Sequence, residues 1–254
     1  MRGMRPVEKM SDPVHWPLTH PTTVWSVLAV YLLFAGTARR IFTGPPVRLP
    51  VVTLAYNFVQ IVLCSYISVE AAVRARRAGY TLVCNAIVHD APVMADLLWV
   101  FYLSKLLDCC DTVFIVLGKR WNQLSFLHVY HHSSVFLFYW VNMRYNFDGD
   151  VYVTMVLNGG VHVLMYTYYA VAMHSRDIWW KRLLTKAQLV QFVLMFLHAG
   201  VLLAGGSSCS NIPPAISGAY LMYVASMFAL FGSFFRKTYD RRAVVAPSET
   251  AKHL

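Results

Sequence analysis

Residues Gln123–Val141 read QLSFLHVYHHSSVFLFYWV, and the stretch contains no Asp, Glu, Lys or Arg. A run of about 20 predominantly apolar residues is long enough to cross the hydrocarbon core of a bilayer as a helix. Lipid offers no partner for unpaired backbone groups, so a single-segment span of this kind has to be helical. The stretch therefore predicts a transmembrane helix, and the three histidines inside it call for an explanation.

The rest of the chain has the same character. Hydrophobic residues make up 57% and charged residues 13% of the 254 positions, whereas soluble domains carry about 25% charged residues. Six further segments are long and apolar enough to span, at 22–38, 50–72, 93–117, 150–173, 187–206 and 212–235. We therefore expect an all-α membrane protein with seven transmembrane helices over 22–235. An N-terminal polar tail over 1–21 and a basic C-terminal tail over 236–254 flank this domain.

The first of these spans has a second interpretation, as a signal peptide cleaved after Gly36-Thr37-Ala38. The polar region before it is too long for a signal peptide. Arg39 and Arg40 directly after it favour retention of that end in the cytoplasm. We expect the segment to remain as a transmembrane helix.

The basic residues predict the orientation, because cytoplasmic loops carry an excess of Lys and Arg. With seven spans, the first, third and fifth loops share a side with the C-terminus. That side holds Arg39, Arg40, Arg48, Lys119, Arg120, Arg176, Lys181, Arg182, Lys186, Arg236, Lys237, Arg241, Arg242 and Lys252. The other side holds half as many: Arg2, Arg5, Lys9, Arg74, Arg76, Arg77 and Arg144. We expect a cytosolic C-terminus, although the group from Arg74 to Arg77 runs against the trend.

The net charge of +10 leaves two interpretations open. Basic residues on the cytosolic side set the topology and contact anionic lipid headgroups. They would equally suit the mouth of a site for a phosphorylated substrate.

Cys84 and Cys209 fall on the non-cytosolic side in this topology, where an oxidising lumen would permit a disulfide between them. The five cysteines show no metal-binding spacing.

Ionisable and polar groups inside spans are costly and are functional candidates. Four consecutive spans contain them, and residues three or four apart share a helix face, so each set forms a stripe that should avoid lipid. The sets are Lys105, Asp108, Asp111 and Thr112; His128, His131 and His132; Asn158, His162, Tyr166 and Tyr169; and Thr185, Gln188 and Gln191.

The stripes also agree in depth. At 1.5 Å per residue from the nearest cytosolic loop, His131 lies about 13 Å deep, Asp108 about 15 Å and His162 about 18 Å. The sequence therefore predicts a polar pocket reached from the cytosol. Plainer interpretations exist for each set alone: a hydrogen-bonded buried histidine, a structural Lys105–Asp108 ion pair, interfacial tyrosines, or glutamines that hold helices together.

Two chemistries suit the histidines. A metal-dependent lipid hydroxylase or desaturase would use boxes that look like H-x-x-H-H, and a single zinc held by His128, His131, His132, His162 and His198 in some combination is geometrically feasible. Acyl chemistry would use imidazole as nucleophile or general base, with Lys105 and Asn158 stabilising an enolate or oxyanion. A seven-span transporter, with polar stripes along a path, is a third alternative.

Four motifs in order, KLLDCCDT, QLSFLHVYHH, NGGVHVLMYTYY and TKAQLVQF, resemble those of the ELO family of fatty-acid elongases, the membrane 3-ketoacyl-CoA synthases. The resemblance implies six of the seven helices in a barrel around an acyl-chain tunnel, and residence in the endoplasmic reticulum. It implies condensation of acyl-CoA with malonyl-CoA, without a metal or other cofactor. No nucleic acid is expected as a partner. Membrane lipid, the ketoacyl reductase, dehydratase and enoyl reductase of the elongation cycle, and a second copy in a homodimer are expected partners.

On that pattern His131 carries the acyl group, His162 stands opposite, and His128 and His132 orient it and handle protons. Asp108, Asp111, Lys105 and Asn158 complete the expected catalytic set. The expected substrate-binding residues are Thr112, Gln123, Tyr166, Tyr169, Gln188, Gln191, Lys119, Arg120, Arg182 and Lys186. The family usually has Glu at the position of Asp108, so the carboxylate is retracted by about one methylene and its partner is left open.

Overall fold

The computed structural model describes residues 16–175, 177–209 and 212–240, and the helices account for most of them. Their bounds are α2 (Pro21–Ile41), α3 (Pro50–Arg77), α4 (Ala95–Asp108), α5 (Cys110–Leu117), α6 (Phe126–Tyr145), α7 (Val151–Ala172), α8 (Lys181–Gly205), η2 (Gly206–Ser208), α9 (Pro214–Phe235) and η3 (Arg236–Asp240). No strand occurs among these residues. Each of the seven predicted spans contains a helix, which confirms the all-α class and the seven-helix count.

Four segments are long and apolar enough to cross a membrane by themselves: Pro21–Ile41, Pro50–Arg77, Lys181–Ser208 and Pro214–Tyr239. Of the helices that carry the polar motifs, α8 is among these four, whereas α4, α5, α6 and α7 are too short or too polar to qualify. This difference follows from the ionisable groups that the middle of the chain places inside its helices.

The prediction of a single helix over 93–117 is wrong in one respect, because the helix is broken at Cys109. The backbone N–H of Cys109 bonds to the carbonyl of Leu106, and the N–H of Thr112 bonds to the carbonyl of Cys109, both at 3.1 Å. Such three-residue bonds tighten the chain relative to an α-helix. The break falls between Asp108 and Asp111, so these two carboxylates are carried by different helices.

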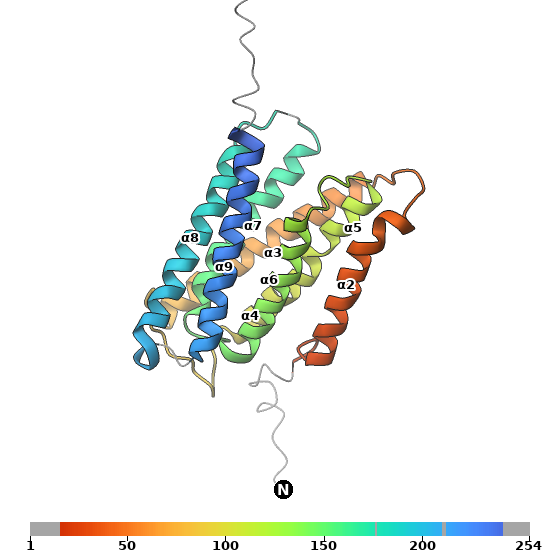
Figure 1. The fold of residues 1–254 in the computed structure, drawn as a ribbon. Coiled ribbons are helices and arrows are strands. Elements are labelled where there is room, and N and C mark those ends of the chain that lie inside the picture. Colours follow the sequence, from red (N-terminus) through yellow and green to blue (C-terminus); the bar gives the residue numbers. More distant parts are fainter. Residues whose placement is uncertain (1–15, 176, 210–211, 241–254) are drawn as a thin grey trace, which may run out of the picture.

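The helices α3, α7, α8, α9, α6 and α4 contact one another in that order, and α4 closes the cycle on α3. Helix α2 stands outside this cycle and packs on α6 and α5. Figure 1 shows α2 at one edge of the bundle and α8 at the other. Polar side chains on the inner faces of the six helices can therefore meet one another without facing lipid.

The interface between α3 and α7 is close-packed at a glycine. A Cβ on Gly159 would collide with the Ser68 hydroxyl and would lie 3.2 Å from the carbonyl oxygen of Cys64. The Ser68 hydroxyl itself donates to the carbonyl of Val156 at 3.2 Å. A small residue at position 159 lets the two backbones approach, as in other closely packed membrane helices.

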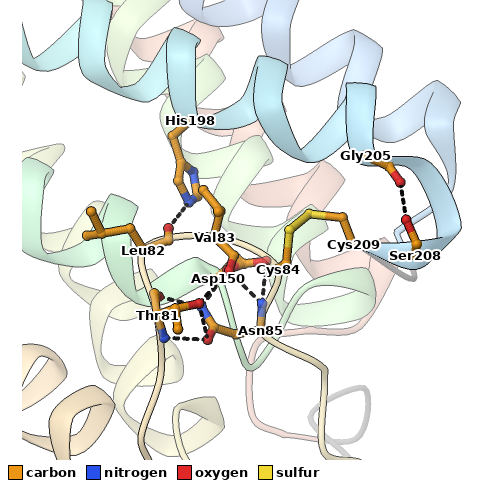
Figure 2. Close-up of a disulfide and its surroundings, with 10 residues drawn as sticks. All are labelled: Thr81, Leu82, Val83, Cys84, Asn85, Asp150, His198, Gly205, Ser208 and Cys209. Carbon is orange, nitrogen blue, oxygen red and sulfur yellow. Dashed lines mark hydrogen bonds between the residues drawn. A yellow bond between two sulfur atoms is a disulfide. The ribbon is translucent and has the colours of Figure 1, made fainter.

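One end of the bundle is closed by the disulfide between Cys84 and Cys209, and we call it the disulfide end. The bond joins the loop between α3 and α4 to the turn after α8 (Figure 2). In the same loop, the side-chain amide of Asn85 donates to Asp150 at 2.7 Å. Three peptide N–H groups donate to the buried carboxylate of Asp148. The loop is thereby fixed to the start of α7.

The opposite end, which we call the basic end, holds the loops after α2, α5 and α7 (Figure 1). There Arg39 donates to the carbonyl of Trp121 at 2.8 Å, and Lys119 donates to the carbonyl of Phe42. Tyr239 of η3 donates to the carbonyl of Lys181 at 3.4 Å. Seven of the basic residues used to predict the orientation lie outside the described residues: Arg2, Arg5, Lys9, Arg176, Arg241, Arg242 and Lys252.

Candidate active site

The three histidines of α6 lie in the first two turns of the helix, next to His162 of α7. Ser125 begins α6 by accepting a hydrogen bond from the backbone N–H of His128 at 3.2 Å. The ring centroids of His128 and His132 are 4.3 Å apart, and those of His131 and His132 are 5.2 Å apart. The rings of His131 and His162 face each other across the two helices at 6.4 Å, inclined by 28°. The histidines therefore form one cluster.

A buried ion pair lies beside this cluster. The Lys105 ammonium donates to Asp108 Oδ2 at 3.1 Å and to Asn158 Oδ1 at 3.2 Å. Lys105 is 0% exposed and Asp108 is 1% exposed. The Lys105 nitrogen also lies 4.4 Å from the centroid of the Phe101 ring, an aromatic face that attracts a cation. The Asp108 carboxylate, the Asn158 carbonyl oxygen and the Phe101 ring therefore all stabilise the positive charge of Lys105.

The Asp108 carboxylate connects the ion pair to the histidines. Its Oδ2 atom lies 3.8 Å from Nδ1 of His162. Its Oδ1 atom accepts from the amide of Gln60 at 2.7 Å and from the hydroxyl of Tyr166 at 3.1 Å. The same hydroxyl lies 3.0 Å from Asp111 Oδ2. Residues of α3, α4 and α7 therefore converge on the Asp108 carboxylate, and the Tyr166 hydroxyl links it to Asp111 of α5.

The outer end of the cluster is held by Thr112 of α5. Its hydroxyl is 2.8 Å from His128 Nε2 and 3.2 Å from the hydroxyl of Tyr31 on α2. Thr112 is fully buried. A hydroxyl can donate to one neighbour and accept from another, so Thr112 can fix the tautomer of His128.

Two histidine nitrogens inside the cluster have no hydrogen-bond partner among the described residues. They are Nδ1 of His132 and Nδ1 of His162. Both side chains are more than nine-tenths enclosed. Buried polar atoms are normally satisfied, so two adjacent exceptions indicate a site that acts on another molecule.

The glutamine and tyrosine predictions have mixed outcomes. Thr185 and Gln191 of α8 are buried, and Gln191 donates to the sulfur of Met195 at 3.3 Å. Gln188 is half-buried. Tyr169 packs edge-on against Tyr166 and is 39% exposed, whereas Asn158, His162 and Tyr166 of the same stripe are buried.

The predicted basic residues gather at the basic end, not inside the cluster. Arg120, Arg182 and Lys186 are exposed, as is Gln123. The Arg182 guanidinium lies 5.6 Å from the ring centroid of Phe235. Lys119 is half-buried, with its ammonium 5.3 Å from the Trp121 ring. These side chains lie at the end of the bundle from which the histidine cluster is entered in the predicted topology.

Comparison with known proteins decides the family. A model of the ELO: GNS1/SUR4 family matches residues 16–246, which is most of the chain. The chain belongs to the ELO family. It is 33% identical to very long chain fatty acid elongase 4 of Homo sapiens, over 93% of this chain and 78% of that protein. It is also 33% identical to very long chain fatty acid elongase 2 of Mus musculus, over 88% of this chain and 77% of that protein.

Three residues of the site in this ELO-family chain come from helices that carry none of its motifs. Gln60 and Tyr56 are on α3, and Tyr31 is on α2. A glutamine within the apolar segment 50–72 is itself a signal, because polar groups in spans need partners. Tyr56, Gln60 and Cys64 repeat at intervals of four, which marks the inner face of α3.

The metal alternative requires several ligating side chains to surround one ion. Within residues 16–175, 177–209 and 212–240, no group of three or more His, Cys, Asp or Glu side chains is arranged to hold a metal ion. His198, one of the predicted zinc ligands of the metal hypothesis, lies near the disulfide end. Its Nε2 atom bonds to the carbonyl of Leu82 at 3.0 Å (Figure 2).

Proposed function

We propose that this ELO-family protein catalyses the condensing step of fatty-acid elongation. An acyl-CoA and malonyl-CoA would give a 3-ketoacyl-CoA two carbons longer, together with CO₂ and CoA. The observation that carries the proposal is the facing pair His131 and His162, set beside the enclosed Lys105–Asp108 ion pair. Membership in a family whose relatives are named very long chain fatty acid elongases supports a fatty acyl substrate.

In the first step the neutral imidazole of His131 attacks the thioester carbonyl of the acyl-CoA. The carbon–sulfur bond breaks, an acyl-imidazolium forms, and the CoA thiolate takes up a proton from solvent. His162 stands across the acyl group, and His128 and His132 hold the orientation of the His131 ring. Thr112 supports His128 from the other side.

In the second step malonyl-CoA loses CO₂, and the electron pair of the broken bond is left on the carbon next to the thioester. That carbon attacks the acyl carbonyl, so a carbon–carbon bond forms and the bond to His131 breaks. Decarboxylation supplies the nucleophile, and no strong base is required. Lys105 and Asn158 provide a fixed cationic and polar environment for the negative charge that develops on oxygen.

The six-helix cycle supports the proposal that the acyl chain lies in a tunnel inside a barrel. The chain would extend from the histidines toward the disulfide end, among aromatic side chains such as Phe138 of α6 and Tyr223 of α9, whose ring centroids are 4.2 Å apart. The CoA would sit at the basic end, near Arg182 and Lys186. We place that end, with the C-terminus, in the cytosol, and the protein in the endoplasmic reticulum membrane.

Intact-protein mass spectrometry tests this function. The purified protein is incubated with a panel of acyl-CoAs without malonyl-CoA. A mass gain of one acyl group, mapped to His131 and lost on adding malonyl-CoA, is expected. Formation of 3-ketoacyl-CoA without any adduct would replace the acyl-histidine route with acid–base catalysis in a ternary complex.

His131→Ala and His198→Ala form a matched pair for the same assay. The first removes the acyl carrier and is expected to abolish both adduct and product, whereas the second alters a histidine near the disulfide end and is expected to leave both. Full condensation by His131→Ala would remove the assignment. No adduct and no product from the unaltered protein, with stoichiometric iron or zinc on metal analysis, would favour the metal-dependent alternative; uptake without turnover would favour a transporter.

A further inference from the structure

Gln60 lies in the middle of α3 and is 0% exposed. Its side-chain nitrogen is 2.7 Å from Asp108 Oδ1, 3.1 Å from the hydroxyl of Tyr56 and 3.1 Å from the hydroxyl of Tyr166. Turning the amide over would place its oxygen against a carboxylate oxygen, and two acceptors at that distance repel. The amide nitrogen therefore has to face Asp108.

The number of available protons makes Gln60 the most important hydrogen-bond donor to Asp108 Oδ1. The Tyr166 hydroxyl carries one proton but approaches two carboxylates, Asp108 at 3.1 Å and Asp111 at 3.0 Å. It can donate to one of them at a time. When it donates to Asp111, Gln60 is the remaining side-chain donor to Oδ1 of Asp108 among the described residues.

The two carboxylate oxygens of Asp108 contact different groups. Oδ1 contacts Gln60 and Tyr166, whereas Oδ2 contacts Lys105 at 3.1 Å and faces His162 Nδ1 at 3.8 Å. A carboxylate can rotate about its χ2 torsion, which has broad minima. A fixed donor on Oδ1 restrains that rotation and keeps Oδ2 toward Lys105 and His162.

We propose that Gln60 is a positioning residue, which holds the Asp108 carboxylate so that one oxygen stays directed at Lys105 and His162. The inference rests on the proposed condensing function. Gln60 does not touch the histidines, so it acts through Asp108. The Gln60 amide and the Asp108 carboxylate together span the distance between α3 and α4. The combined length of the two side chains therefore determines whether their hydrogen bond can form.

A reach-conserving swap tests this directly. Gln60→Asn shortens the amide side chain by one methylene, and Asp108→Glu lengthens the carboxylate side chain by one. Each single variant misplaces the contact and is expected to lower kcat by at least about 10-fold, because small displacements of catalytic groups are costly. The double variant restores the total length and is expected to recover most of the lost kcat. KM should change less than kcat throughout, because Gln60 does not contact substrate.

Asn57→Leu is the matched control, since Asn57 is another buried amide of α3 and donates to the sulfur of Met173 at 3.7 Å. Thermal unfolding in detergent is recorded for every variant. We expect Asn57→Leu to keep kcat while it lowers the melting temperature as much as Gln60→Asn does. If Gln60→Asn alone does not fold but the double variant with Asp108→Glu folds and is active, this result also shows that the two side chains are coupled.

A swap no better than the worse single variant, in turnover or in folding, would overturn the proposal. So would a Gln60→Asn variant whose kcat equals that of the unaltered protein. Failure of the proposed function itself looks different, because the unaltered protein would then form no 3-ketoacyl-CoA at all.

Discussion

Lys105 and Asp108 form an ion pair one helical turn apart, with 3.1 Å between the ammonium nitrogen and Oδ2, and both side chains are closed off from the surface. Removing two charges from water is expensive, and their attraction offsets this only when further hydrogen bonds satisfy the remaining groups. Asn158, Gln60 and Tyr166 supply those bonds. The pair is therefore one part of a connected polar network and each member depends on the others.

Replacing Lys105 with Met leaves the Asp108 charge buried without its cation. We expect a loss of about 3–5 kcal/mol in stability, as for other buried pairs that lose one partner. The double variant Lys105→Met/Asp108→Asn removes both charges while Gln60 and Tyr166 keep an acceptor, and it should regain most of that stability. Thermal unfolding in detergent measures both.

Condensation activity separates the structural role from the catalytic one in these two variants. Neither should form 3-ketoacyl-CoA, because the cationic environment is gone in both. Recovery of activity together with stability in the double variant would mean that the pair is only a structural lock.

Much of this fold follows from the sequence, because hydropathy and helix length are local properties. Each of the seven predicted spans holds a helix. The break at Cys109 was not predictable, since KLLDCCDT contains neither Pro nor Gly, the usual causes of a break. Its position depends on how α4 and α5 pack on different neighbours, which no local pattern records.

The site was predictable to the extent that spacing determines a helix face. The shared face of His128, His131 and His132 follows from i, i+3 and i+4 periodicity, and the similar depth of His131 and His162 follows from the rise per residue of each helix. The partner of Asp108 did not follow, because Gln60 is 48 residues away and one isolated glutamine has no periodic companion of the same type. Pairing across helices depends on tertiary packing, and periodicity alone does not specify it.

The contact between Thr112 and His128 predicts a second outcome. Thr112→Val keeps the volume but removes the hydroxyl that meets His128 Nε2 at 2.8 Å. The imidazole then loses the group that fixes its tautomer, and we expect kcat to fall by about 10-fold, which is less than the ~10²–10⁴-fold contribution of a positioned acid–base group itself. Steady-state kinetics with one acyl-CoA measures this.

Tyr31→Phe is the control for the Thr112 variant, because it removes the other hydroxyl neighbour of Thr112 and leaves the contact with His128. It should retain most of the activity. Equal losses in the two variants would show that the hydroxyl network as a whole, not the bond to His128, is required.

Two adjacent glycines on α7 make a third prediction. A Cβ at Gly159 would meet Ser68 and the backbone of α3, whereas a Cβ at Gly160 would meet nothing within 4 Å. Gly159→Ala should therefore destabilise the protein by about 1–3 kcal/mol through overpacking. Gly160→Ala should be neutral or stabilising by up to about 1 kcal/mol, because alanine favours the helix. Equal melting temperatures for the two variants would contradict the close approach of α3 and α7.

The exposed basic residues at the basic end lead to the last prediction. Lys186 lies in the second turn of α8 and is exposed, one turn from Arg182. If the phosphates of CoA bind there, Lys186→Glu should raise KM for acyl-CoA with little change in kcat, since uniform binding is lost and the chemistry is untouched. The increase in KM should shrink at high salt, because exposed charges are screened over about 8 Å at physiological ionic strength.

Arg76→Glu is the control for Lys186→Glu, because it reverses an exposed charge at the opposite end of the bundle and should leave KM unchanged. An equal rise in KM for both variants would indicate a general effect of net charge on substrate partitioning, and it would remove Lys186 from the binding site.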